Sequence, residues 1–102
     1  MRILLVCSGG MSSAIVMKTL AEAGTKRGME LQVEAVGSGE AQDAIGRSAW
    51  DVVLVAPQVR NRFRTFKEYA DDSGIPIENI PPRLYSPLGG DGLLDLALSI
   101  KG

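Results

Sequence analysis

The chain has 102 residues, of which 45% are hydrophobic, and its 11 basic and 12 acidic side chains leave a formal net charge of −1. This length fits one domain, the charge balance gives no footprint for binding nucleic acid, and no apolar run approaches the ~18 residues of a membrane span. A single cysteine excludes an internal disulfide, and the first residues lack a signal peptide's cleavage region, so we expect a reduced, cytoplasmic setting.

The chain opens with the pattern of a strand, a loop and a helix. Ile3–Val6 is a short apolar run that predicts a buried strand, and the small residues of Cys7–Ser13 form the loop after it. Apolar residues at helical spacing predict a helix over Met11–Lys26, with Gly28 as its stop signal. The only cysteine therefore lies where the first strand ends and the loop begins.

The middle of the chain predicts an edge strand, a short helix and a central strand. Leu31–Val36 alternates apolar and polar residues, as in a half-covered strand, and Glu40–Ser48 has the spacing of a short helix. Asp51–Val55 contains a continuous apolar run rich in β-branched residues, which is typical of a central strand in a parallel sheet. We interpret Trp50, directly before it, as a packing anchor rather than a binding residue.

The last part of the chain predicts a long amphipathic helix, a short strand and a final helix. Apolar residues recur at helical spacing over Val59–Ala70, and Gly74 is the stop signal. A short strand is expected within Ile75–Ile80, followed by a loop over Arg83–Gly90. Asp91 is expected to cap the last helix.

The long helix carries a basic face, formed by Arg60, Arg62, Arg64 and Lys67. One interpretation is a solvated surface, which is the usual reason for a run of charges. The other is a docking surface for acidic or phosphorylated partners. The sequence is compatible with both.

Strands that alternate with helices predict an α/β fold, a single domain with a four-stranded parallel sheet in the order 2-1-3-4 and helices on both faces. In that order the topological switch point lies between the first and third strands, where ligands bind at the carboxyl ends of the strands. Those ends are Cys7 and the Pro57-Gln58 pair, so two separate features predict one site. We expect Gln58 and Tyr85 to form the rim of this site.

The loop after Cys7 suits the transient binding of an anion. A thiol is a nucleophile only as a thiolate, and a free thiol is roughly 3% ionised at neutral pH. A glycine-rich turn before a helix N-terminus presents backbone N–H groups that stabilise a thiolate, or a phosphoryl group on the sulfur. The alternative is that Cys7 is a small core residue, because cysteine is among the most buried residue types. The expected phosphate-binding loop consists of Ser8, Gly9, Gly10, Met11, Ser12 and Ser13.

Several other sites lack a residue that they require. No lysine follows the glycine pair as in a P-loop, and the dinucleotide-binding fingerprint G-x-G-x-x-G is incomplete. A thioredoxin-like site needs a second cysteine, and a cysteine hydrolase needs a histidine, of which the chain has none. Nothing in the sequence requires a metal or a cofactor.

The run Cys7-Ser8-Gly9-Gly10-Met11-Ser12-Ser13 resembles the phosphocysteine loop of the IIB components of the lactose/cellobiose family, in the bacterial phosphoenolpyruvate-dependent sugar phosphotransferase system. That family typically has a cysteine, two or three small residues, a methionine and a Ser-Ser or Ser-Thr pair after its first strand. Pro57-Gln58 and the segment from Tyr85 to Asp91-Gly92 resemble it as well, so the likeness extends over the whole length. Ala14 departs from it, because a further polar residue would be expected there.

The resemblance implies one phosphocarrier domain over residues 1–102. It implies that Cys7 accepts a phosphoryl group from a histidine of a separate IIA protein and passes it to a sugar held by the membrane IIC component. The lack of histidine in this chain agrees with a donor imidazole from another protein. Lactose, cellobiose, chitobiose and related β-glycosides are all open as the sugar, since IIC makes the sugar contacts in the family. We expect a monomer.

Two other functions stay open. One is a regulatory or binding module with the same fold, phosphorylated on Cys7 without sugar transfer. The other is a small phosphatase, because the loop also resembles that of the low-molecular-weight tyrosine phosphatases. Those enzymes bind the phosphate dianion with an arginine six residues after the cysteine, and this chain has Ser13 there. The difference argues against phosphatase or arsenate-reductase chemistry.

Overall fold

Strands and helices alternate along the computed structural model of the chain, which describes residues 1–8, 11–47 and 49–101. The strands are β1 (Arg2–Cys7), β2 (Gln32–Gly37), β3 (Val52–Val55) and β4 (Ile77–Asn79). The α-helices are α1 (Met11–Lys26), α2 (Ala41–Arg47), α3 (Phe63–Asp72) and α4 (Gly90–Lys101). Short 3-10 helices η1 (Ser38–Glu40), η2 (Pro57–Arg62) and η3 (Pro82–Leu84) precede α2, α3 and the loop before α4.

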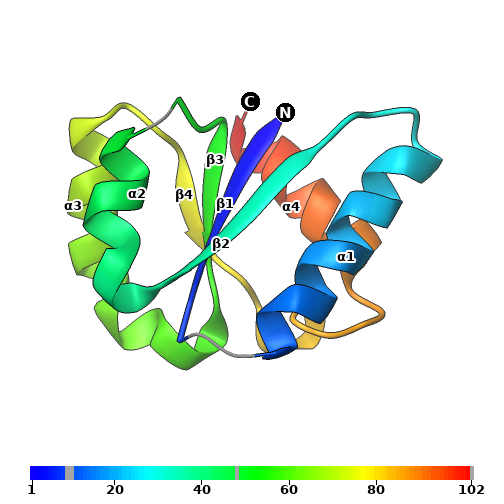
Figure 1. The fold of residues 1–102 in the computed structure, drawn as a ribbon, viewed down its shortest axis with the longest axis horizontal. Coiled ribbons are helices and arrows are strands. Elements are labelled where there is room, and N and C mark those ends of the chain that lie inside the picture. Colours follow the sequence, from blue (N-terminus) through cyan, green and yellow to red (C-terminus); the bar gives the residue numbers. More distant parts are fainter. Residues whose placement is uncertain (9–10, 48, 102) are drawn as a thin grey trace.

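The four strands are parallel and lie in the order β2-β1-β3-β4, which confirms the predicted fold class and strand order (Figure 1). β1 pairs with both β2 and β3, and its residues from Ile3 to Cys7 are buried. β3 is buried throughout, as its unbroken apolar run predicts. β2 pairs with β1 alone and alternates exposed and half-buried residues from Gln32 to Ala35, as expected of an edge strand.

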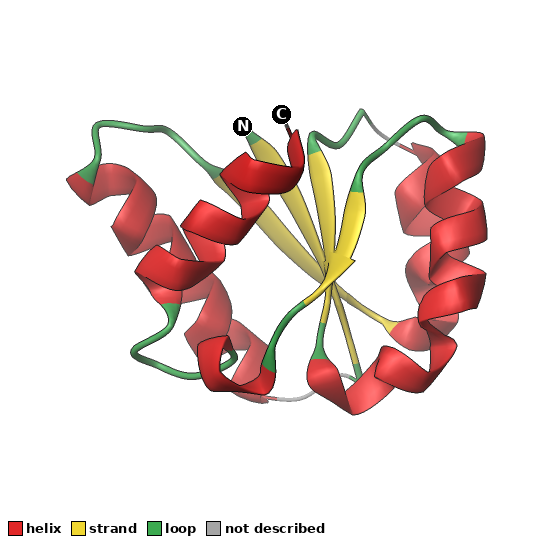
Figure 2. Ribbon diagram, turned by 180° about the vertical axis from the view of Figure 1, so that it is seen from behind, coloured by secondary structure: helices red, strands yellow, loops and turns green. Residues whose placement is uncertain are grey.

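Two pairs of helices cover the sheet, α1 and α4 on one face and α2 and α3 on the other (Figures 1 and 2). Because successive side chains of a strand point to opposite faces, Ile3 and Leu5 pack toward α1 and α4, whereas Leu4 and Val6 pack toward α2 and α3. Burying one such side chain contributes about 1.5–3 kcal/mol. In the part of the chain that the structure describes, no helix is both long and apolar enough to cross a membrane.

Glycines with positive φ end two of the helices. Gly28 follows α1 with a φ of 71°, and Gly74 follows α3 with a φ of 70°. Glycine adopts this left-handed conformation without the steric cost that a Cβ atom brings. Both residues were predicted as stop signals, and both predictions are confirmed.

The helix predicted over Val59–Ala70 is wrong in its first part. α3 begins at Phe63, and the residues before it form η2, in which Val59 has non-helical angles of φ −121° and ψ 19°. The backbone N–H of Val59 donates to the carbonyl of Ala56 at 3.1 Å, in a turn that follows the strand directly. Val59 is nevertheless buried, at 6% exposed. The apolar spacing therefore indicated which residues are buried in the core, but not where the helix begins.

Asp91 does not cap the last helix, which begins one residue earlier at Gly90. Asp91 lies in the first turn, and its carboxylate is 3.6 Å from the guanidinium of Arg27, which also pairs with Asp95 at 2.7 Å. These carboxylates raise the pKa of Arg27, chiefly through the hydrogen bond that its guanidinium donates to Asp95. A side chain on Gly90 would collide with the carbonyl oxygen of Thr19 in α1, so only glycine fits where α4 starts.

The segment expected to be a loop over Arg83–Gly90 is shorter than predicted. Its first two residues belong to η3, and its last residue begins α4. Gly89 lies so close to the backbone of Leu84 that a Cβ atom would overlap the carbonyl oxygen. The turn is therefore a tight, packed connection, and the two glycines make it possible.

Candidate functional site

Cys7 is the last residue of β1 and lies at the carboxyl end of the sheet. In the parallel register it stands opposite Gly37, the last residue of β2. On the other side, the backbone N–H of Ala56 donates to the carbonyl of Val6 at 2.8 Å, which holds the end of β3 beside β1. The fold thus brings Cys7 to the switch point between β1 and β3, where parallel sheets bind ligands.

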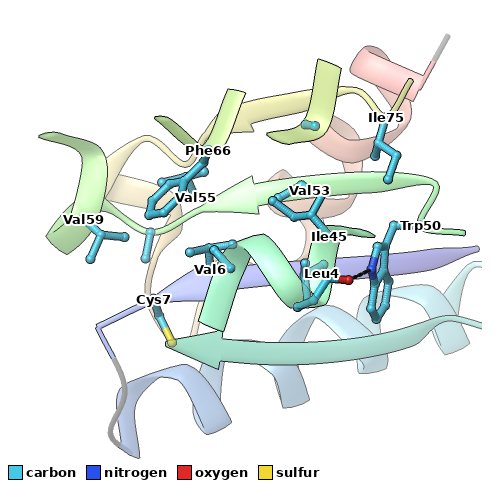
Figure 3. Close-up of a cluster of buried hydrophobic side chains, with 14 residues drawn as sticks. Leu4, Val6, Cys7, Ile45, Trp50, Val53, Val55, Val59, Phe66 and Ile75 are labelled. Atoms are coloured by element: carbon cyan, nitrogen blue, oxygen red, sulfur yellow. Dashed lines mark hydrogen bonds between the residues drawn. The ribbon is translucent and has the colours of Figure 1, made fainter. Parts of the chain in front are cut away.

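The thiol of Cys7 is buried and hydrogen-bonded to the backbone of the edge strand. The residue is 3% exposed, and its Sγ donates to the carbonyl oxygen of Val36 at 3.4 Å. It belongs to the hydrophobic cluster on the α2–α3 side, together with Ala56 and Val59. Figure 3 shows the sulfur beside the end of β2. In this conformation the thiol is bonded to the carbonyl of Val36, so any reaction of the sulfur requires the side chain to turn away from that carbonyl.

The segment after Cys7 leads directly into α1. Ser8 is exposed, Gly9–Gly10 lie outside the described residues, and the helix begins with the backbone of Met11–Ser12. The first turn of α1 carries no acidic residue. The first N–H groups of a helix have no partner within it and bear a partial positive charge. Because α1 starts four residues after Cys7, its positive end lies at the carboxyl edge of the sheet, where it favours an anion.

Ser13 is the buried polar residue of the part of the chain that the structure describes, at 8% exposed. It stands six residues after Cys7, at the position where the tyrosine phosphatases have their arginine. A serine offers a hydroxyl there and no positive charge. The structure therefore gives this position no cation for a phosphate dianion.

The two residues predicted for the rim lie on segments that follow β3 and β4. Gln58 is exposed in η2, three residues beyond the end of β3. Tyr85 directly follows η3, is half-buried and packs against both hydrophobic clusters, including the one that contains Cys7. Their part in the site stays a prediction.

Sequence reasoning missed two features of this region. The acceptor for the Cys7 thiol is a backbone carbonyl 29 residues away, which no side-chain pattern signals. The second feature is a groove of about 440 Å³ between α1 and the segment before α4, and Cys7 does not line it. Ile15 and Leu88 border this groove with 48% and 96% of their surface exposed. The one signal of this groove in the sequence was Leu88, an apolar residue within the segment predicted as a loop.

Comparisons with known proteins point to one family. Residues 2–95 match the family model described as "PTS system, Lactose/Cellobiose specific IIB subunit". The chain is 30% identical over 99 residues to the PTS system oligo-beta-mannoside-specific EIIB component of Bacillus subtilis (strain 168), which covers 97% of this chain and 94% of that protein. It is 29% identical over 96 residues to the PTS system lactose-specific EIICB component of Lacticaseibacillus casei, and covers 16% of that longer protein.

A solved structure gives the same result for the fold. The lactose-specific IIB component domain from Streptococcus pneumoniae superposes on this chain with a TM-score of 0.81 and 25% sequence identity. The match covers 98% of this chain and 96% of that one. The likeness therefore includes all four strands and all four α-helices described above.

Proposed function

This chain belongs to the lactose/cellobiose-specific IIB family of the phosphotransferase system, and from that premise we propose that it is a phosphocarrier with Cys7 as its phosphoryl acceptor. Cys7 receives the group from a histidine of a IIA protein and passes it to a sugar bound by the membrane IIC component. The activity is that of a protein-phosphocysteine–sugar phosphotransferase, and it uses no metal or cofactor.

The position of Cys7 is the observation that carries this proposal. The residue ends the central strand β1 and is followed after three residues by the positive end of α1. A phosphoryl group on its sulfur would thus lie at the end of a helix that stabilises anions. Ser8 and the helix-start residues Met11, Ser12 and Ser13 supply further donors, and we assign Gly9 and Gly10 the close backbone approach.

The first step exchanges a nitrogen–phosphorus bond for a sulfur–phosphorus bond. The thiol of Cys7 leaves the carbonyl oxygen of Val36, loses its proton, and the thiolate attacks the phosphorus of the donor phosphohistidine. The bond between phosphorus and the imidazole nitrogen breaks, its electron pair stays on nitrogen, and the proton from the thiol ends on the imidazole. Positioning and electrostatic stabilisation carry most of the catalysis in such transfers.

The second step returns the sulfur to its starting state. A hydroxyl oxygen of the sugar attacks phosphorus, the sulfur–phosphorus bond breaks, and the hydroxyl proton ends on the sulfur of Cys7. The same N–H groups stabilise the phosphoryl group as it arrives and as it leaves. Cys7 is therefore the nucleophile of the first step and the leaving group of the second.

The membrane partner is supported by the relative from Lacticaseibacillus casei, named as an EIICB component, in which the region similar to this chain makes up 16% of a longer protein. We infer that this chain works with a separate or fused IIC component in the same way. The relatives are named for oligo-β-mannoside and for lactose, so the family resemblance leaves the sugar open.

The proposal is tested by intact mass and peptide mapping. The protein is mixed with phosphoenolpyruvate, the general phosphotransferase proteins and IIA proteins of the lactose/cellobiose family, with a known IIB protein as positive control. We expect one phosphoryl group, mapped to Cys7, and its passage to sugar once a IIC component is added. Phosphorylation without any passage to sugar would support the regulatory module, and no phosphorylation beside an active control would refute the carrier.

A further inference from the structure

A basic surface lies at the start of α3 and is made of Arg60, Arg62 and Arg64. All three side chains are exposed. Within the described residues neither Arg60 nor Arg64 has a carboxylate partner, and the guanidinium of Arg62 lies 5.6 Å from the centre of the Phe66 ring. Lys67, one turn later, is different because its ammonium pairs with Asp71 at 3.1 Å. Three arginines without a carboxylate partner therefore lie within residues 60–64.

The stability of α3 does not explain these arginines. A helix has a positive N-terminal end, so cations are favoured in its last turn and repelled from its first. α1 and α4 follow this rule, with Lys26 and Lys101 in their last turns. α3 reverses it, because its first turn has no acidic residue and Asp71 and Asp72 stand at its end. Charges placed against the helix dipole and left unpaired indicate a partner outside the chain.

The basic surface borders the end of the sheet that holds Cys7. Val59, directly before Arg60, is buried in the same hydrophobic cluster as Cys7, and Figure 3 shows both at the same end of that cluster. The hydrogen bond from Ala56 to Val6 fixes the residue before η2 beside the carboxyl end of β1. A partner that touches the basic surface therefore lies at the edge where the thiol is.

We propose that Arg60, Arg62 and Arg64 form an electrostatic docking surface for an acidic face of the histidine-phosphorylated IIA donor, an inference that rests on the proposed function. The donor brings a dianionic phosphoryl group, whereas the acceptor sugar is neutral. The chain as a whole has a net charge of only −1, so this attraction is local and orients the donor toward Cys7. Phosphoryl transfer itself then weakens the contact, because negative charge leaves the donor and arrives beside the arginines.

The test compares two double variants that remove the same charge from opposite ends of the molecule. R60Q/R64Q removes the two unpaired arginines and leaves Arg62 against its aromatic ring. K26Q/K101Q is the matched control, since its exposed lysines stand in the last turns of α1 and α4, away from the carboxyl end of the sheet. Both variants lower the net charge by two.

The donor is the lactose/cellobiose-family IIA protein that phosphorylates the wild-type chain fastest. Rapid quenching gives the second-order rate constant of transfer at limiting donor, at salt concentrations from about 0.05 to about 0.5 M. We expect R60Q/R64Q to lower it about tenfold at low salt, to converge with the wild type at high salt, and to leave the transfer rate at saturating donor unchanged. K26Q/K101Q should stay within twofold of the wild type throughout.

Three results would overturn the docking surface. The first is an equal loss in both double variants, and the second is a loss that does not depend on salt. The third is an unchanged rate in R60Q/R64Q together with lost binding to vesicles that contain phosphatidylglycerol, which would assign the arginines to a membrane surface. If the wild-type chain accepts no phosphoryl group at all, the proposed function fails first, and the rate series shows this before any variant is compared.

Discussion

At the amino end of the sheet, Arg2, Trp50 and Asp51 bond to groups within the chain, whereas Arg60 and Arg64 beside the carboxyl end have no carboxylate partner in the described residues. At the amino end the backbone N–H of Arg2 donates to the carboxylate of Asp51 at 2.7 Å, and the N–H of Asp51 donates to the carbonyl of Arg2 at 2.8 Å. The guanidinium of Arg2 lies 4.7 Å from the centre of the Trp50 ring, whose N–H donates to the carbonyl of Ala44 at 2.7 Å. This end of the sheet is closed by its own residues.

The carboxyl end carries arginines without carboxylate partners in the described part of the chain. The thiol of Cys7 makes a single long hydrogen bond of 3.4 Å, and Arg60 and Arg64 face solvent. Figure 3 shows Cys7 and Trp50 at opposite ends of one hydrophobic cluster. The same core therefore supports both ends of the sheet. The amino end is bonded within the chain, and the carboxyl end is accessible to other molecules. Changes at the first end should alter the free energy of unfolding, and changes at the second should alter transfer.

The largest effect is expected from Cys7→Ser at the carboxyl end. The hydroxyl is a far weaker nucleophile than a thiolate, so phosphoryl transfer from IIA should fall below detection. The smaller side chain keeps Val36 as hydrogen-bond acceptor, and the free energy of unfolding should fall by only about 1–2 kcal/mol. Transfer by quenched assay and denaturant unfolding measure the two quantities separately. Sugar phosphorylation through the serine variant would remove Cys7 from the mechanism.

The opposite result is expected from Trp50→Ala at the amino end. Trp50 is 6% exposed, which confirms its prediction as a packing anchor, and truncating such a ring should lower the free energy of unfolding by about 3–5 kcal/mol. Trp50→Phe is the matched control, because it keeps an aromatic ring and loses the bond to Ala44, for about 1–3 kcal/mol. The transfer rate per folded molecule should not change in either variant. A specific loss of transfer would show that the two ends are coupled.

A smaller loss is expected from Asp51→Ala. Its carboxylate accepts a charge-assisted bond from the N–H of Arg2 in a partly buried position, and removing it should cost about 1.5–3 kcal/mol. Asp72→Ala serves as the control, since Asp72 is an exposed carboxylate at the end of α3 and should shift stability by less than about 0.5 kcal/mol. Chemical denaturation checks both. Equal shifts would mean that the contact between Asp51 and Arg2 adds nothing to folding.

The elements of the fold that follow from local pattern were predictable, and those that depend on close contacts were not. Two continuous apolar runs, one alternating segment and one short segment predicted the strands, and their alternation with helices predicted a parallel sheet. The start of α3 was missed because buried Val59 continues the helical spacing although its backbone is not helical. The start of α4 at Gly90 depends on the close approach of Thr19 in α1 to Gly90, and no local sequence pattern indicates this contact.

The candidate site divides in the same way. The place of Cys7 at the carboxyl end of a central strand follows from the order of strand, loop and helix. The burial of its thiol and the bond to Val36 come from a neighbouring strand, so only the three-dimensional structure shows them. The sequence left two interpretations of Cys7 open, a nucleophile and a core residue. In this conformation the side chain is packed as a core residue, at the position where a nucleophile is expected.

The smallest effect is a gain in stability from Gly46→Ala, near the end of α2. A Cβ atom at Gly46 would have no atom within 4 Å apart from its chain neighbours and the backbone of its own helix, and alanine restricts the unfolded chain more than glycine does. The free energy of unfolding should rise by about 0.4–1 kcal/mol, with transfer unchanged. Gly90→Ala is the matched contrast at the start of α4, where the added Cβ would meet Thr19 and should cost about 1–3 kcal/mol. A loss of stability in Gly46→Ala would instead show that the last turn of α2 is not helical in solution. The amino end of the sheet would then be less tightly bonded than the contacts of Trp50 and Asp51 indicate.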